Sequence, residues 1–296
     1  MKNIIFLITI SFSLFQACSN FKFCNNSIPS NSLICIVNID STKLSLLKEV
    51  YNSNVLADSI PSDKDGNLTG FKTGNRYILE NILKPAIELN RKKLEMLPQN
   101  EIINQMTILS FKVFQSLLQK DFYRWGGDLL DLDDPQSEGV RFRYKYGLDC
   151  SGFAVSGYEL AVESKLIDSK GILFSSKGYK EFCYETGFID GGGINGTSNG
   201  FRLDTKELDR LGTEVLRIEK NQEIKLEDVS KLRAGDIVGR NGHFGIIVES
   251  GNILYYLESG GWVVPFCEGN PVEVFSALNR FSENGYVSVR RCLEVK

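Results

Sequence analysis

The chain has 296 residues, of which 42% are hydrophobic and 24% are charged. This composition is typical of a globular protein with a sizeable core, and the length suggests about two domains. The formal net charge of -3 at pH 7 gives no basic footprint for nucleic acid. After the N-terminus there is no second long apolar run, so the sequence predicts no further membrane-spanning helix.

The first residues of the chain have the features of a targeting segment. Lys2 supplies a positive charge, residues 4–15 form a short apolar run, and Ala17 directly precedes Cys18. This order resembles a bacterial lipobox, in which Cys18 is acylated and becomes the new N-terminus of an exported lipoprotein. An ordinary signal peptide, with Cys18 incidental, is the alternative. Resemblance to other lipoproteins, with Ser19 after the cysteine, is compatible with an outer-membrane address facing the periplasm.

Residues 19–98 are predicted to form an N-terminal accessory region. Residues 33–37 are apolar and predict a short buried strand, and residues 77–97 predict a helix that breaks or kinks at Pro85. The sequence leaves open whether this region is a wall-binding module or a helical spacer. Residues 102–118 then predict an amphipathic helix, which leads into the sequence YRWGG at 123–127.

A cysteine at a predicted helix start dominates the middle of the chain. Residues 150–165 read as a helix, and Asp149 is a good N-cap residue because its carboxylate can accept the first backbone N–H groups. Cys150 would then feel the partial positive charge of the helix N-terminus, which favours a nucleophilic thiolate. Ser151 and Gly152 are small, so a backbone N–H there could face an oxyanion. A buried structural thiol is the alternative.

The chain has one histidine that could act as a base for such a cysteine. His243 follows Gly242 and begins an apolar, β-branched run at residues 244–248, which reads as a buried strand. Residues 232–238, LRAGDIV, read as a turn that enters another strand just upstream. A histidine at the mouth of a strand beside a hairpin is expected to be well held and reachable.

Four segments in this order resemble the signature of the NlpC/P60 family of papain-like cysteine peptidases. They are YRWGG at 123–127, DCSGF at 149–153, LRAGDIV at 232–238 and HFGI at 243–246. Enzymes of that family mostly cut the stem peptides of bacterial peptidoglycan. The resemblance covers residues 99–296 and implies an α+β fold with helices packed on an antiparallel sheet. The segment between the helix that begins at Cys150 and Gly235 is longer than the family leads us to expect. The resemblance therefore predicts the catalytic pair but not the loops of the substrate cleft.

The resemblance also implies roles for individual residues. Cys150 is the nucleophile and His243 the base, while Tyr123 lines the cleft and could donate to the oxyanion or to the substrate backbone. The alternative for Tyr123 is a place in the core wall. Asp149 would help to bind a free substrate amine in addition to capping the helix, and Ser151 is counted with the substrate-binding residues.

A third polar residue is expected on the strand that returns after the turn at 250–252. Glu258 is the candidate to accept the other imidazole N–H and so fix the histidine tautomer. Tyr256 lies on the same face of that strand by its period of two and is the alternative. A solvated strand end is the structural alternative for Glu258. Residues 262–266 and 286–295 are read as further strands.

The cysteine pattern predicts neither a zinc site nor a complete set of disulfides. With Cys18 acylated and Cys150 free, five cysteines remain, an odd number that cannot all pair within one chain. Cys24 and Cys35 are near enough in sequence to pair, but the pairing stays open. With one histidine and no C-x-x-C pair, no metal is expected, and the chemistry requires no organic cofactor. The glycine-rich residues 191–200 are read as either a mobile cleft lip or a surface loop.

Cys150 and His243, together with the resemblance, predict a thiol protease that reacts through a thioester on Cys150. The resemblance implies that the reaction is hydrolysis of peptidoglycan stem peptides, at the bond between γ-D-glutamyl and a diamino acid. The alternatives are an N-acetylmuramoyl-L-alanine amidase or another papain-like amide hydrolase, and a wall-binding lipoprotein whose catalytic site has decayed. The expected partners are stem peptides and a membrane reached through the lipid anchor, with no nucleic acid.

Overall fold

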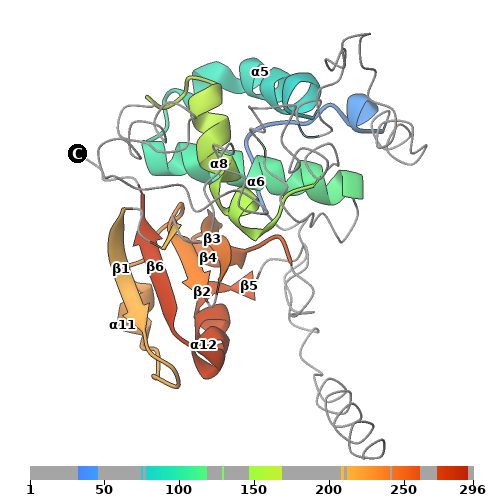
Figure 1. The fold of residues 1–296 in the computed structure, drawn as a ribbon. Coiled ribbons are helices and arrows are strands. Elements are labelled where there is room, and N and C mark those ends of the chain that lie inside the picture. Colours follow the sequence, from blue (N-terminus) through green and yellow to red (C-terminus); the bar gives the residue numbers. More distant parts are fainter. Residues whose placement is uncertain are drawn as a thin grey trace, which may run out of the picture.

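The computed structural model describes residues 33–45, 75, 78–118, 129, 147–168, 208–209, 212–240, 242–260 and 272–292. Within these residues, several helices lie on one side of an antiparallel sheet (Figure 1). The predicted α+β arrangement of helices packed on an antiparallel sheet is therefore confirmed. The predictions for Cys18, Tyr123 and residues 191–200 concern positions outside the described residues.

The helical layer contains α5 (Lys84–Leu94), α6 (Gln99–Leu118) and α8 (Cys150–Glu163). A π-helical turn, η3 (Leu79–Leu83), leads directly into α5, which has Pro85 at its start. Because proline has no N–H and crowds the preceding turn, the regular helical ladder changes there. The backbone stays helical on both sides of Pro85, so the helix predicted there changes type instead of ending, and the predicted helices at α6 and α8 are confirmed.

The sheet has six strands in the order β1-β6-β2-β3-β4-β5, and every neighbouring pair is antiparallel. The strands are β1 (Thr213–Ile218), β2 (Ile237–Arg240), β3 (His243–Ser250), β4 (Ile253–Leu257), β5 (Val272–Glu273) and β6 (Val287–Arg291). The predicted hairpin of β3 and β4 is confirmed. Its turn uses Gly251 and Asn252, whose φ angles of 60° and 64° suit a two-residue hairpin loop.

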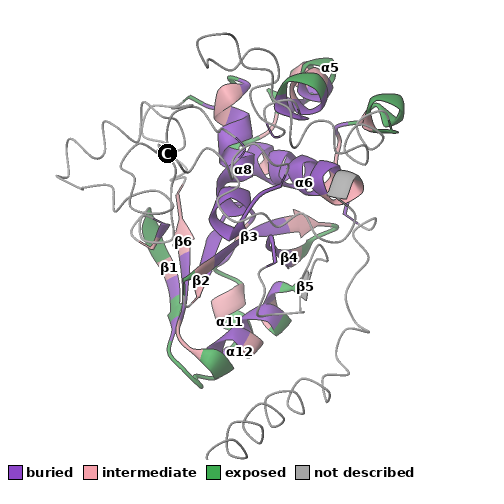
Figure 2. Cartoon of the chain, turned by 45° about the vertical axis from the view of Figure 1, so that its right-hand side comes forward, coloured by how far each residue is buried: buried purple, intermediate pink, exposed green. Residues whose placement is uncertain are grey.

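The two faces of the sheet pack against different helices. Phe244, Ile246 and Val248 alternate along β3 and belong to the hydrophobic cluster that includes α6 and α8. Ile247 points to the other face, into a second cluster with α12 (Val274–Asn284). Figure 2 shows α8 as buried along most of its length, and β3 is buried in its middle, from Phe244 to Val248. Cys150 is therefore held by the core, and His243 is held by the buried strand that follows it.

The predicted strand at residues 33–37 is wrong. The backbone there is irregular, and the N–H groups of Ile34 and Ile36 bind side chains in place of a neighbouring strand. The N–H of Ile34 donates to the Ser250 hydroxyl of β3 at 3.2 Å. The N–H of Ile36 donates to Gln105 Oε1 at 2.8 Å, and the Cys35 thiol reaches the Gln105 carbonyl at 3.6 Å. Leu33 and Val37 are buried in the same hydrophobic cluster as α5, α6 and α8. Cys35 and Ile36 are half-buried and Ile34 is 66% exposed, so the apolar run predicted burial only in part and backbone conformation incorrectly.

Four elements were not expected from the sequence, and the shortest is the two-residue strand β5. The end of the long segment after α8 supplies the edge strand β1, which pairs with β6, and the short helix α11 (Leu226–Val229). Helix α12 covers the face of the sheet opposite α8 (Figure 1). Residues on both sides of the predicted boundary at residue 98 share one hydrophobic cluster, and the division into two domains stays a prediction. Among the described residues, no helix is both long and apolar enough to cross a bilayer.

Candidate active site

Cys150 is the first residue of α8, as predicted, and its surroundings are fixed by the helix cap. Asp149 has an extended backbone, and its Oδ1 accepts the Gly152 N–H at 2.9 Å and the Ser151 hydroxyl at 3.0 Å. The predicted N-cap role of Asp149 is confirmed. Ser151 is 1% exposed and takes part in the cap, and its role toward a substrate stays a prediction.

Two residues that sequence reasoning did not single out hold the chain in front of Cys150. Asn75 is buried and binds both backbone groups of Gly147, accepting its N–H at 2.9 Å and donating to its C=O at 2.7 Å. Gly147 has a φ of 123°, which favours glycine. The Ser259 hydroxyl donates to the Leu148 carbonyl at 2.5 Å. The position of Cys150 is thus fixed from the helix behind it and from the loop before it.

His243 is the first residue of β3 and lies directly opposite Arg240 of β2. Its Nε2 is 2.8 Å from Glu258 Oε2, and the Cys150 side chain is near enough to the imidazole to raise its pKa. Since Nε2 faces Glu258, Nδ1 is the nitrogen left for the thiol. The structure therefore brings together Cys150, His243 and Glu258, three residues that the sequence predicted as one site.

Glu258 follows β4 and is buried, with its side chain wholly excluded from solvent. Besides His243, it accepts a hydrogen bond from Tyr256 Oη at 2.5 Å and pairs with Arg240, whose Nη2 is 3.0 Å from Oε2 and 3.4 Å from Oε1. Both candidates for the third residue are thus present, and Glu258 is the one that contacts the imidazole. The structural alternative, in which Glu258 would be a solvated strand end, is wrong.

Gly245 leaves the space that the Tyr256 ring occupies on its way to Glu258. A Cβ at position 245 would lie 2.4 Å from two carbons of that ring, closer than real Cβ contacts allow. The ring also meets Phe281 of α12 edge to face, with centroids 4.9 Å apart. The hydroxyl of Tyr256 is therefore aimed at the carboxylate by rigid neighbours on two sides.

The charges in the site favour a protonated histidine beside an ionised carboxylate. Burial by itself would lower the pKa of His243, but the hydrogen bonds to Cys150 and Glu258 outweigh it and raise the pKa to about 9. Burial would raise the pKa of Glu258, but the hydrogen bond and charge of His243, with the charge of Arg240, lower it. A protonated His243 would place a positive charge beside the sulfur of the candidate nucleophile.

The other described cysteines lack such a partner. Cys35, Cys150 and Cys292 are free thiols among the described residues. Burial raises the pKa of Cys292 to about 12 and raises the pKa of Cys35. Both groups are expected to stay as unreactive thiols near neutral pH.

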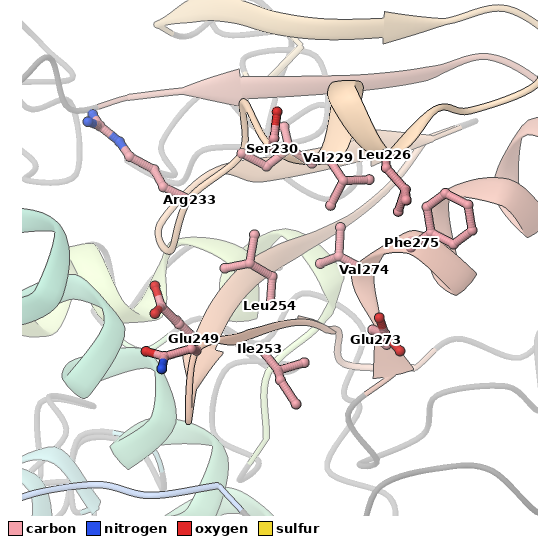
Figure 3. Close-up of a pocket in the computed structure, with 12 residues that line it drawn as sticks. Leu226, Val229, Ser230, Arg233, Glu249, Ile253, Leu254, Glu273, Val274 and Phe275 are labelled. Atoms are coloured by element: carbon pink, nitrogen blue, oxygen red, sulfur yellow. The ribbon is translucent and has the colours of Figure 1, made fainter.

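A separate groove lies between α11, the β3–β4 hairpin and the start of α12 (Figure 3). Its volume is about 460 Å³, and its walls include Leu226, Ile253 and Phe275. It contains none of the three residues Cys150, His243 and Glu258. Within the described part of the chain, no group of three or more His, Cys, Asp or Glu side chains could hold a metal ion.

Comparisons of the chain with protein-family models, curated proteins and solved structures found no match. The function is therefore inferred from the residues of this site and from the four sequence segments described above. Of those segments, DCSGF, LRAGDIV and HFGI lie among the described residues, and YRWGG lies outside them.

Proposed function

We propose that this chain is a papain-like cysteine hydrolase of the NlpC/P60 type. The observation that carries the proposal is the contact of the only histidine of the chain with both Cys150 and buried Glu258. A nucleophile, a base and a residue that orients the base are the parts that thiol-dependent acyl transfer requires. The order of the four sequence segments supports the family assignment.

In the proposed first half-reaction, the Cys150 thiolate attacks the carbonyl carbon of an amide bond and forms a tetrahedral intermediate. The backbone N–H at the start of α8 stabilises the oxyanion, with the positive end of the helix behind it. The intermediate then collapses, the carbon–nitrogen bond breaks, and the leaving amine takes a proton from His243. The products of this step are the free amine and a thioester on Cys150.

In the second half-reaction, a water molecule attacks the thioester while His243 accepts its proton. Collapse of the second intermediate breaks the carbon–sulfur bond, releases a carboxylate and restores the thiolate–imidazolium pair. Glu258 keeps its charge throughout and holds Nε2, so that the other ring nitrogen faces the reacting atoms.

The proposed substrate is a peptidoglycan stem peptide, cut between γ-D-glutamyl and the diamino acid. This choice rests on the family resemblance, which also gives Tyr123 a place in the cleft and Asp149 a contact with a free substrate amine. The Asp149 carboxylate already caps α8 through Oδ1, so a role with substrate would be added to the cap. We further propose export and anchoring through acylated Cys18, which would place the enzyme near the wall.

The test is a digest of purified muropeptides by the full chain in detergent, followed by mass spectrometry. The proposed bond gives a disaccharide that keeps the alanyl-glutamyl dipeptide, and a free peptide that begins with the diamino acid. An amidase would release the whole stem peptide from the sugar. His243→Ala is expected to lower turnover by roughly 10²–10⁴-fold. Absence of any cleavage by the folded wild-type chain would support a wall-binding protein instead.

A further inference from the structure

Arg240 takes part in the candidate active site although no sequence motif points to it. It is the last residue of β2 and pairs with His243 across the β2–β3 ladder, so both side chains leave the same face of the sheet. Its Nη2 lies within 3.4 Å of both carboxylate oxygens of Glu258, and its side chain is 14% exposed. One buried carboxylate is thus shared between a guanidinium and an imidazole.

The position of the guanidinium is fixed by an aromatic ring. The Cζ atom of Arg240 lies 4.2 Å from the ring centroid of Phe281, on α12. A cation over an aromatic face is attracted by the ring, and the contact gains strength when it is shielded from water. Since Phe281 also packs on Tyr256, the same ring orients two of the donors that reach Glu258.

We propose that Arg240 is a positioning residue of the Cys150–His243 pair, which shares Glu258 with the imidazole and thereby limits how tightly His243 holds its proton. The groups that face this carboxylate come from three strands: Arg240 of β2, His243 of β3 and Tyr256 of β4. Cys150 faces the imidazole from α8, and α12 contributes the uncharged Phe281 ring.

The effect of Arg240 depends on which charges remain beside Glu258 when His243 loses its proton. With Arg240 in place, Glu258 keeps a cationic partner, so the neutral imidazole leaves no unpaired buried charge. Without Arg240, deprotonation of His243 would leave the buried Glu258 carboxylate without a cationic partner, which is costly. The direct repulsion of the imidazolium by the guanidinium would also be absent. Both effects make His243 hold its proton more tightly. A base that holds its proton too tightly accepts one from water less often near neutral pH, which slows deacylation.

The chain has one histidine, so a full chain in detergent with label only on histidine gives a single imidazole signal to titrate by NMR. In Arg240→Gln, the His243 midpoint is expected to move to higher pH, with proton affinity raised by about threefold or more. Arg240→Lys is the matched control, since it keeps the charge, and its midpoint is expected to stay near the wild-type value. In a Glu258→Gln background, the effect of Arg240→Gln is expected to shrink, because the shared carboxylate is absent.

A second variant keeps the proposal testable if Arg240→Gln does not fold. Phe281→Leu keeps every charge and removes the ring that holds the guanidinium, so it should move the midpoint in the same direction by a smaller amount. An unchanged midpoint in the variants that fold, or an equal shift in the Glu258→Gln background, would contradict the proposal. The link to deacylation rests on the proposed function, but the titration does not. A shifted midpoint without muropeptide cleavage would therefore support the proposed role of Arg240 and contradict only the proposed enzymatic function.

Discussion

The side chain of Asn75 binds both backbone groups of Gly147, the residue three positions before Cys150, as the backbone of a neighbouring strand would. Its amide oxygen and nitrogen bind the N–H and C=O of Gly147 at 2.9 and 2.7 Å, across 72 positions of sequence. Through this pair, a residue of the predicted accessory region holds the loop that leads to Cys150, the proposed nucleophile. Asn75 is thus part of the framework of the candidate site.

Asn75→Ala is expected to lower both stability and turnover. The substitution leaves two buried backbone groups of Gly147 without their partner, at a cost of about 1–3 kcal/mol for each unsatisfied group. A loosened loop would also move Cys150 away from His243, and small errors of position cost rate. Urea unfolding and muropeptide turnover measure the two effects.

Asn104 offers a matched control for this variant. It makes the same pair of hydrogen bonds to the backbone of Glu249, at 2.9 and 3.0 Å, at the far end of β3 from His243. Asn104→Ala should therefore lose comparable stability and keep its turnover at temperatures where it is folded. Equal losses of turnover in both variants would show that Asn75 acts on stability alone.

Glu258→Gln is expected to lower the pKa of His243, because it removes the negative charge that helps to raise this pKa to about 9. The alkaline limb of the pH–rate profile should then move to lower pH, since the imidazolium is lost earlier. An alkaline limb that stays in place would remove Glu258 from the role of orienting residue.

The same pair gives a stability prediction with a defined sign. The folded pKa of Glu258 lies below its ordinary value of 4.5, so its contribution is present above that pH and is lost as pH falls through the folded value. The folded pKa of His243 lies above 6.5, so its contribution is full below 6.5 and is lost as pH rises through about 9. The difference in unfolding free energy between wild type and Glu258→Gln should be largest between pH 4.5 and 6.5.

The sequence predicted the ends of elements better than the contacts between distant ones. Asp149 as cap and Cys150 as first helical residue followed from local chemistry, and the β3–β4 hairpin followed from an apolar, β-branched run and the turn at 250–252. Asn75 was missed because its partner Gly147 lies 72 positions away, and Arg240 was missed because no local pattern marks its position. The run at 33–37 was misread as a strand because its apolar residues suggested one, whereas the N–H groups of Ile34 and Ile36 bind the side chains of Ser250 and Gln105.

The export prediction is tested by Cys18→Ser in the full chain. Because an acyl chain can be attached only to the thiol of residue 18 in the proposed lipobox, this variant should lose metabolic labelling by fatty acid. The protein should also move from the membrane fraction to the soluble fraction, since the anchor supplies the membrane affinity. Cys24→Ser serves as the control and should keep both properties. Unchanged labelling in Cys18→Ser would contradict acylation at this residue and would favour the alternative of an ordinary signal peptide.

The final prediction concerns the nucleophile and decides the class of the protein. Cys150 begins α8 and lies near enough to His243 to raise the pKa of the imidazole, whereas burial raises the pKa of Cys292 to about 12. A sub-stoichiometric dose of iodoacetamide at neutral pH should therefore label Cys150 before Cys35 or Cys292, as peptide mapping would show. In His243→Ala the preference for Cys150 should weaken, because the imidazolium that favours the thiolate is gone.

Cys150→Ser completes the test by separating fold from chemistry. Serine is close in size, so the melting transition should stay near that of the wild type, but its hydroxyl is far less acidic and the site is arranged for a thiolate. Muropeptide cleavage should be lost in this variant, while Cys292→Ser, at a thiol remote from the imidazole, should keep it. Cleavage by Cys150→Ser at a rate near wild type would show that the thiol is not the nucleophile. Preferential labelling of another cysteine with activity retained would contradict the mechanism in the same way, because the reactive thiol and the catalytic one would then be different groups.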